Sequence, residues 1–393
     1  MENNIIVEIE DSIKKNIENF TSMGVTNGLA GVSLFYYYKY EKKQNQQFEL
    51  DNCLHYLEKS INGLDENYSG PNIVNDILEI GNLLDFYIEK GVLDNEVTLP
   101  YFDAYDSILE SYLLDNLEKD QLSPAFGALQ FSNYFIFKQQ TLNDKYIYLF
   151  SKGLEKIEEL SFEHPDSNGI YWKSNIKRDN EYLIELGIKH GVMGIVDHLV
   201  KLFQLGFKTQ RVLDLIQKAM RYIVYFKEEK GKALFPFSTE KNTADRSFSF
   251  GTVYGDLGVA YGFYKVGKIC DLPEYVNIGV DILLNSCMYR DNEKKITDAS
   301  LLYGNLGIAS LLSLFKKNCN SHILDISIDY WYNRTKEYNV NNNQWAGFDP
   351  TFNRFDSNAQ LSFGHGIVGI GIALLNFENN LNFDFLRFLN YSL

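Results

Sequence analysis

A short glycine pattern returns along this chain, and each copy opens a run of apolar residues. Its form is X-Gly-x-x-Gly, followed by mostly apolar, helix-compatible residues. Five copies are clear, and two worn copies lie around Ser69-Gly70 and Phe126-Gly127. The X positions of the clear copies are Asn27, His190, Tyr254, Tyr303 and His365. A pattern that returns at intervals of roughly 40 to 65 residues indicates repeated supersecondary units that bury their faces on one another.

Segments with the periodicity of amphipathic helices alternate with these copies. Their apolar residues recur at three- and four-residue intervals. They are Val7–Phe20, Ile73–Lys90, Asp103–Glu118, Lys145–Leu160, Thr209–Lys227 and Tyr275–Met288. Alternation typical of strands is confined to short stretches near Gly169–Trp172 and Ala233–Pro236. We therefore predict an all-α chain of about seven helical hairpins arranged around an axis. An open solenoid is the alternative, although solenoids usually keep a tighter repeat length.

The composition favours one large domain. Of 393 residues, 45% are hydrophobic and only seven are proline. The repeats run from Asn27 to His365, and no Gly/Ser-rich or Pro-rich tract interrupts them. We predict a single domain over residues 1–393.

The charge and the cysteines limit the partners and the compartment. A net charge of −15 repels phosphates, so we expect no nucleic-acid partner, and it suits a basic peptide segment. The first residues lack the features of a signal peptide, and no apolar run is long enough to span a membrane. Cys53, Cys270, Cys287 and Cys319 lie far apart without a CxxC pair, as expected of buried thiols in a reducing cytoplasm. We expect a cytoplasmic protein without a transmembrane segment.

The paired glycines need a reason, because a glycine within a helix costs about 1 kcal/mol relative to alanine. Glycines three residues apart share one helix face and permit close approach where helix starts crowd a common axis. Residue X then lies at the helix N-cap or just outside it and can point toward that axis. Asn27 is a good cap residue, but histidine and tyrosine are not. We therefore take His190, Tyr254, Tyr303 and His365 as the candidate catalytic residues.

Six segments, spread over nearly the whole length, resemble the lanthionine synthetase C-like family, the cyclases of lanthipeptide maturation. They are Asn27–Phe35, Gly169–Ser174, Leu186–Gly206, Tyr254–Gly267, Asp298–Leu312 and Leu361–Leu375. The resemblance implies an α/α toroid, or barrel, of inner and outer helices with the active site at its centre.

The resemblance also implies a reaction and a metal. The family adds a cysteine thiol to a dehydrated serine or threonine of a precursor peptide, and a zinc ion held by two cysteines and one histidine activates the thiol. Here Val253 and Leu302 stand at the cysteine positions and Tyr303 at the histidine position. None of the three is an ordinary zinc ligand. We expect the zinc site to be degenerate and predict no cofactor.

One functional position is retained. His190 matches the histidine proposed as the family's general acid/base, whereas His365 has no counterpart in the family pattern. If the ring closes, both histidines point into one central pocket with Tyr254 and Tyr303.

Three readings of this site compete. In the first, the chain binds a modified precursor peptide in its central cleft without zinc, as an atypical cyclase or a peptide-binding scaffold. In the second, it is an active, metal-free lanthionine-forming cyclase that uses His190 and His365 with tyrosines as acid and base. The third is a relocated metal site on those histidines, for which Asp256 is the best additional ligand. Whether the chain is an enzyme stays open at this point.

Other activities lack the residues they need. Glycoside hydrolysis requires two carboxylates facing the cleft, and no X position carries Asp or Glu. No Gly-x-Ser-x-Gly motif supports a serine nucleophile. By resemblance, the expected partners are a precursor peptide, a dehydratase and a membrane transporter, so any association with the membrane is made through partners.

Overall fold

The computed structural model describes residues 2–42, 46–139, 142–175, 177–178, 180–239, 250–292, 294–319, 321–340, 342–350 and 357–392. Its contacts divide the chain into two compact units. Unit 1 combines Met1–Tyr105 with Asp291–Leu393, and unit 2 is Asp106–Arg290. The single domain expected over residues 1–393 stays a prediction.

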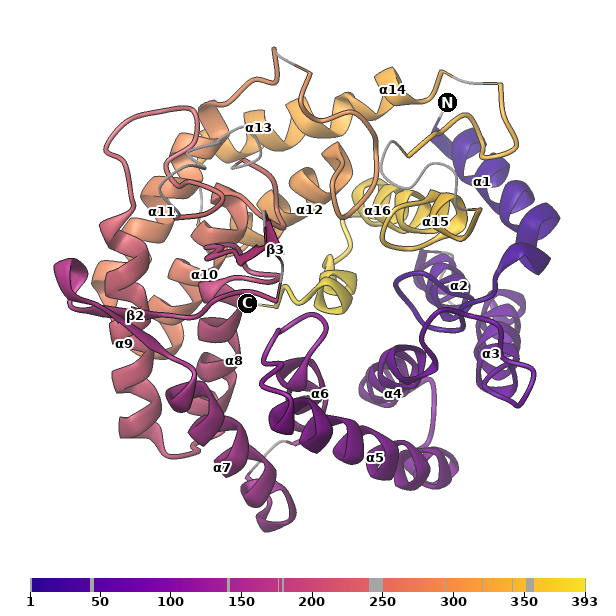
Figure 1. Ribbon diagram of the computed structural model, residues 1–393. Helices are drawn as coiled ribbons and strands as arrows, with labels where there is room; N and C mark the ends of the chain where they lie inside the picture. The colour runs from indigo at the N-terminus through magenta and orange to yellow at the C-terminus, as the bar shows by residue number, and fades with distance from the viewer. Residues whose placement is uncertain are drawn as a thin grey trace. The chain divides into compact units, whose positions relative to one another are not determined.

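Helices dominate both units (Figure 1). Unit 1 contains α1 (Glu2–Asn16), η1 (Ile17–Asn19), α2 (Ala30–Lys42), α3 (Gln47–Asn62), α4 (Ile73–Glu89), α12 (Asn305–Lys316), α13 (His322–Asn333), α14 (Thr335–Tyr338), α15 (Ser357–Leu361), α16 (Ile367–Asn379) and η3 (Asp384–Leu389). Unit 2 contains α6 (Ala128–Phe137), α7 (Asp144–Glu159), η2 (Pro165–Ser167), α8 (Val192–Gln204), α9 (Thr209–Tyr225), α10 (Asp256–Ile269) and α11 (Pro273–Met288). Helix α5 (Asn95–Glu118) begins in the first unit and ends in the second.

Strands are short in the described part of the chain. The strand β1 (Phe162–His164) pairs antiparallel with β2 (Gly169–Tyr171), and β3 (Lys177–Arg178) pairs antiparallel with β4 (Glu181–Tyr182). The strand expected near Gly169–Trp172 is therefore confirmed.

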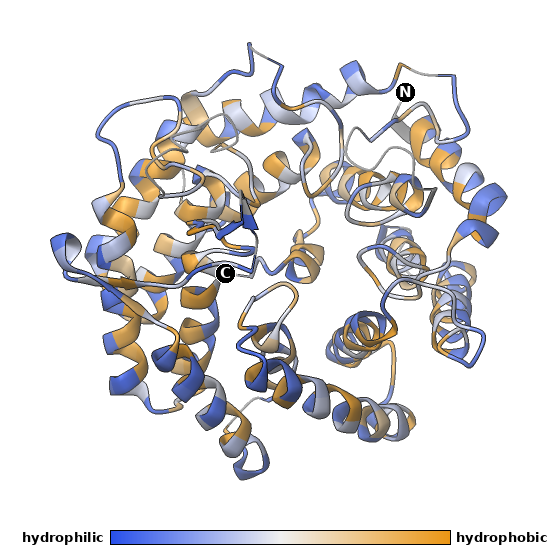
Figure 2. Cartoon of the chain, in the orientation of Figure 1, coloured by the Kyte–Doolittle hydropathy of each residue, from blue (hydrophilic) through white to orange (hydrophobic). Residues whose placement is uncertain are grey.

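The helices form two layers within each unit. In unit 1, α16 packs against both α2 and α12, and in unit 2, α8 packs against both α6 and α10. Each of these helices except α16 also packs against the helix that follows it along the chain. Helices α8 and α16 are buried on almost every side, whereas α7 and α9 bury one face (Figure 2). The sequence shows the same contrast, because a helix covered on all sides is apolar on all sides.

The six periodic segments all form helices. The bounds differ most for α5, which starts at Asn95, eight residues before the expected start at Asp103. Pro100 lies inside this helix and faces solvent. A proline within a helix removes one backbone hydrogen bond, and here the helix continues through it.

The strand expected at Ala233–Pro236 is wrong. The backbone N–H groups of Leu234 and Phe235 donate to the two carboxylate oxygens of Asp256, at 2.6 and 3.2 Å. A buried carboxylate at the start of α10 thus satisfies the donors that a neighbouring strand would have bonded.

A buried charge cluster joins α8 to α10. Asp197 forms an ion pair with Lys201 at 2.7 Å and accepts a hydrogen bond from Lys265 at 2.8 Å, and all three side chains are at most 5% exposed. Burial acts to raise the pKa of Asp197, but the two ammonium groups hold it at about 2. His198 next to it is a packing histidine, because its Nδ1 lies 2.8 Å from Oδ1 of Asn133 and burial lowers its pKa to about 3.

Among the residues that the structure describes, no helix is both long enough and apolar enough to cross a bilayer.

Candidate functional site

Four of the five clear glycine copies, together with one worn copy, form the same local structure. We call residue X, the three residues before it and the glycine after it a glycine loop, and name each loop by its X residue. In five loops the N–H of that glycine donates to the carbonyl of the first loop residue, which closes a single helical turn. The donor and acceptor pairs are Gly127–Ser123, Gly191–Gly187, Gly255–Gly251, Gly304–Ser300 and Gly366–Ser362, at 2.9 to 3.1 Å.

The glycine at the end of the loop is the N-cap residue of the next helix, so X lies just outside the cap. This holds for α6, α8, α10, α12 and α16, none of which has a side-chain cap hydrogen bond. Backbone carbonyls act as caps in its place. The N–H of Val192 donates to Glu185 at 2.9 Å, and that of Asn305 donates to Asp298 at 3.1 Å. Residue X is therefore free of any capping role.

The glycines make room for these carbonyls. A Cβ atom on Gly191 would lie 2.4 Å from the carbonyl oxygen of Glu185, and one on Gly307 would lie 1.8 Å from that of Leu301. The closest approach is thus to the chain's own preceding loop, whereas we expected it between neighbouring helix starts. A helix N-terminus has unpaired N–H groups, and the glycines let main-chain carbonyls reach them.

The worn copies differ in outcome. Phe126-Gly127 forms a glycine loop, although Gln130 replaces the second glycine. Ser69-Gly70 does not, because α4 is capped by the side chain of Asn72, which accepts from the N–H of Asn75 at 3.2 Å.

Sequence reasoning missed one signal. The residue three positions before X is always glycine or serine: Gly24, Ser123, Gly187, Gly251, Ser300 and Ser362. In the serine cases the Oγ accepts from the N–H of X, at 3.3 Å for Phe126, 3.3 Å for Tyr303 and 3.1 Å for His365. The full motif is therefore [SG]-x-x-X-Gly.

In unit 2, three X residues stack in a row. The ring of His190 lies 5.0 Å from that of Phe126 and 5.9 Å from that of Tyr254, and both pairs of planes are inclined by 24°. Phe126 is 61% exposed, whereas His190 is only 7% exposed. Phe237 contacts the other end of the row, edge-on to Tyr254 at 5.4 Å. His190 and Tyr254, two of the four candidate residues, are therefore in ring contact within this unit.

This stack changes the acid–base character of His190. Burial between the rings, together with the charge of Lys189, lowers its pKa to about 4. A cysteine thiol has a pKa of about 8.5, so proton transfer from the thiol to this imidazole is uphill by about 6 kcal/mol. His190 is neutral at pH 7 but a weak base.

In unit 1, the other two candidates pair. The rings of Tyr303 and His365 stack at 5.5 Å with planes inclined by 23°. Backbone hydrogen bonds join their glycine loops, since the N–H of Leu302 donates to Gly364 at 3.0 Å and the N–H of Gly364 donates to Thr26 at 2.9 Å. That all four candidates line one pocket stays a prediction, because the two pairs belong to different units.

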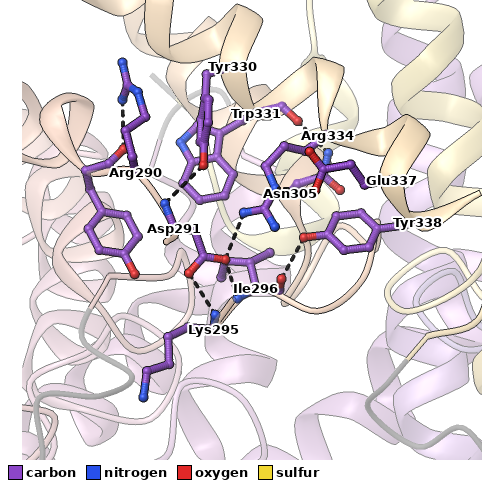
Figure 3. Close-up of polar contacts among 11 residues, drawn as sticks. Arg290, Asp291, Lys295, Ile296, Asn305, Tyr330, Trp331, Arg334, Glu337 and Tyr338 are labelled. Carbon is purple, nitrogen blue, oxygen red and sulfur yellow. Dashed lines mark hydrogen bonds and ion pairs between the residues drawn. The ribbon is translucent and has the colours of Figure 1, made fainter. Parts of the chain in front are cut away.

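Asp291 fixes the segment that leads to the Tyr303 loop (Figure 3). Its carboxylate accepts from the N–H groups of Lys295 and Ile296 at 2.8 and 2.9 Å, and from Arg334 at 2.9 Å. Burial would raise the pKa of Asp291, but these bonds hold it below its ordinary value. The Tyr338 hydroxyl also donates to the Ile296 carbonyl at 2.6 Å.

The positions at which the resemblance implies zinc ligands do not fit that metal. Val253 and Leu302 are buried aliphatic side chains, and Tyr303 stacks on a ring. Asp256 uses both carboxylate oxygens as acceptors of backbone N–H groups. Among the residues that the structure describes, no three His, Cys, Asp or Glu side chains are grouped so that they could hold a metal ion.

Trp172 and two of the cysteines have packing roles, as expected for the cysteines. Trp172 is buried and donates from Nε1 to the Ile157 carbonyl at 2.7 Å. Cys270 and Cys287 are both buried, and burial raises the pKa of Cys270 to about 11.

Comparisons with known proteins agree with this geometry. No curated protein sequence matches the chain. Among solved structures, nisin cyclase matches with a TM-score of 0.69 and 19% sequence identity, over 98% of this chain and 96% of that one. The expected fold class, an all-α toroid of α/α type, is confirmed by this match. The family model described as "Lanthionine synthetase C-like protein" matches residues 19–385. The chain therefore belongs to the lanthionine synthetase C-like family.

Proposed function

We propose that this chain binds a dehydrated precursor peptide of the lanthipeptide type and works without zinc, as a peptide-binding scaffold or an atypical cyclase. Family membership supports a peptide partner. The observation that carries the proposal is the pair of aliphatic side chains, Val253 and Leu302, at the positions implied for zinc thiolates. Without a metal, a cysteine thiol is only a few per cent ionised at neutral pH.

The state of His190 supports the scaffold form of this proposal. A general base works best with a pKa near the operating pH, and that of His190 is about 4. The neutral imidazole can still hydrogen-bond a peptide, and the exposed face of Phe126 beside it offers an aromatic surface for side chains. Aromatic residues are enriched where proteins bind one another.

A second candidate is the metal-free cyclase. It is favoured by the Tyr303–His365 pair, in which a phenol and an imidazole lie in contact. In this reaction the thiol sulfur adds to the β-carbon of the dehydrated residue, the thiol loses a proton and the α-carbon gains one. One group of the pair would accept the first proton and the other would donate the second.

Two measurements on purified protein test the proposal. Elemental analysis should give far less than one zinc per chain, and stoichiometric zinc would overturn the metal-free form. Isothermal titration should show that a dehydrated, cysteine-containing peptide binds more tightly than its unmodified serine and threonine precursor. Equal affinities, or no binding, would contradict a role in binding the modified peptide.

Mass spectrometry separates the two candidates. The dehydrated peptide is incubated with the protein in a chelator, and its free thiols are counted by alkylation. The cyclase would be established if the wild-type protein consumes the free thiols and the His365→Ala and Tyr303→Phe variants do not. Unchanged thiols with tight binding would establish the scaffold. We further propose that the protein acts in the cytoplasm alongside a dehydratase and a transporter.

A further inference from the structure

Two carboxylates on α4 hold the loop that precedes α2. Asp76 accepts from the Ser22 hydroxyl at 2.7 and 2.9 Å and from the N–H of Met23 at 2.5 Å. Glu79, one turn further along the helix, accepts from the N–H of Thr26 at 2.7 Å. The two carboxylates therefore hold both ends of the segment that leads to Asn27.

The loop is pressed closely onto these groups. A Cβ atom at Gly24 would lie 2.4 Å from Oε2 of Glu79 and 2.6 Å from Oδ1 of Asp76. Only glycine allows this approach, which explains why the first loop has glycine three residues before X.

The contact continues to the Tyr303–His365 pair through the main chain. Thr26 donates from its N–H to Glu79 and accepts at its carbonyl from Gly364, at 2.9 Å. Gly364 accepts at its own carbonyl from the N–H of Leu302, at 3.0 Å. Gly364 directly precedes His365, and Leu302 directly precedes Tyr303. Three consecutive hydrogen bonds therefore connect Glu79 to the residues that directly precede the two rings.

We infer that Glu79, supported by Asp76, is a positioning residue that sets the places of His365 and Tyr303 through Thr26 and Gly364. The inference rests on the proposed function in one respect, because that proposal gives Tyr303 and His365 their role in peptide binding or cyclisation. Glu79 itself touches neither ring in any contact described above, so it is not a catalytic residue.

The charge of Glu79 gives this link a pH dependence. Burial and then the neighbouring Asp76 raise the pKa of Glu79 to about 7, although the side chain keeps partial contact with solvent. The Tyr68 phenol, bonded to Asp76 at 2.8 Å, is the other titratable group at this place. Residues 21–29 contain no charged side chain. Since hydrogen bonds to an ionised acceptor are roughly twice as strong as neutral ones, the loop is held more firmly above pH 7.

Nuclear magnetic resonance can test this without any peptide. The chain contains three Phe-Gly pairs, Phe126-Gly127, Phe250-Gly251 and Phe363-Gly364, and all three glycines lie in glycine loops. Protein labelled with carbonyl-¹³C phenylalanine and ¹⁵N glycine therefore gives three amide signals in an HNCO spectrum. Only Gly364 bonds to Thr26, so Gly127 and Gly251 are internal controls.

We expect the Gly364 signal alone to titrate with a midpoint near pH 7. The Glu79→Gln variant keeps an acceptor for Thr26 but cannot ionise, so its Gly364 signal should stay near the wild-type position and lose this titration. The Glu79→Leu variant removes the acceptor and should displace the signal at every pH. The matched control is Glu89→Gln, at the far end of α4, where the carboxylate pairs with Arg387. It should behave as the wild type does.

Persistence of the titration in Glu79→Gln would overturn the inference, because His365 would then be its source. An unmoved Gly364 signal in Glu79→Leu would also overturn it. If Glu79→Leu does not fold, Glu79→Gln alone decides. Peptide affinity measured from pH 6 to 8 should change with pH in the wild type and become flat in Glu79→Gln. Failure of every variant to bind peptide would contradict the proposed function, while the amide signals would still decide the role of Glu79.

Discussion

The ring of His190 stacks on the ring of Phe126, with centroids 5.0 Å apart and planes inclined by 24°. Phe126 is exposed on the outside of this stack and His190 is buried beneath it. One exposed phenylalanine thus shields the histidine that the resemblance marks as an acid or base.

Phe126→Ala should therefore raise the pKa of His190 from about 4 toward the ordinary value of about 6.5, because water gains access to the imidazole. Titration of the histidine signals by nuclear magnetic resonance measures this, and His190→Phe assigns the signal. Phe48→Ala, which removes another exposed phenylalanine, on α3, is the control and should leave the pKa unchanged. A His190 pKa that stays near 4 in Phe126→Ala would show that the stack does not set it.

The lowered pKa values of His190 and His198 make stability depend on pH. Between about pH 6.5 and pH 4 the unfolded chain binds protons at these histidines that the folded chain does not. Their contribution to the free energy of unfolding is complete above pH 6.5 and is lost as the pH falls. Glu79 acts in the opposite sense, because its raised pKa lowers stability as the pH rises from about 4.5 to 7.

His190→Phe keeps a ring in the stack and removes one of these titrations. We expect the loss of unfolding free energy between pH 7.5 and pH 5 to be smaller in this variant than in the wild type, by about 1–2 kcal/mol. Urea unfolding at the two pH values measures the difference. Identical losses in the two proteins would mean that His190 binds its proton equally in the folded and unfolded chains.

The second glycines of the motif should not tolerate a methyl group. Gly307→Ala would place Cβ 1.8 Å from the Leu301 carbonyl oxygen, a backbone atom that cannot move away alone. We expect a loss of about 3 kcal/mol. Gly153→Ala, inside α7 with nothing within 4 Å of the new atom, should instead stabilise the protein by about 0.5–1 kcal/mol. Thermal and chemical unfolding compare the two, and similar effects of both changes would refute the role given to Gly307.

In the charge cluster on α8 and α10, removing the carboxylate should destabilise the protein more than removing one ammonium group. Asp197→Asn leaves two buried ammonium groups without a carboxylate, and we expect a loss of about 3–5 kcal/mol. Lys265→Met leaves the balanced pair of Asp197 and Lys201, and the loss should be only about 1–2 kcal/mol. Urea unfolding at pH 7 gives both values. A larger loss of unfolding free energy in Lys265→Met than in Asp197→Asn would contradict this expectation.

Much of the fold could be predicted because two periodicities reinforce each other. The glycine pattern marks helix starts, and three- and four-residue apolar spacing marks the helices between them. The start of α5 was placed too late because a proline at position 100 argues for a helix boundary by local rules. The strand assigned to Ala233–Pro236 was wrong because its N–H groups bond a carboxylate far along the chain, which no local pattern reveals.

The candidate residues could be picked out from the repeats, but their ring partners and electrostatics could not be predicted. The stack on His190 depends on Phe126, which lies in a copy with only one of the two glycines. Glu79 carries no motif at all, and its importance arises from contact with a loop more than fifty residues earlier, at 2.7 Å from the Thr26 nitrogen. Contacts of this kind are set by tertiary packing, which the spacing of residues along the sequence does not predict.

Because main-chain carbonyls do the capping at the glycine loops, the helix behind each loop does not depend on the side chain at X for its cap. An imidazole or a phenol can stand there with the same helix start behind it, as His190 and Tyr303 show. In a scaffold built this way, the residue that faces the chemistry and the atoms that cap the helix are separate, so one can change while the other stays.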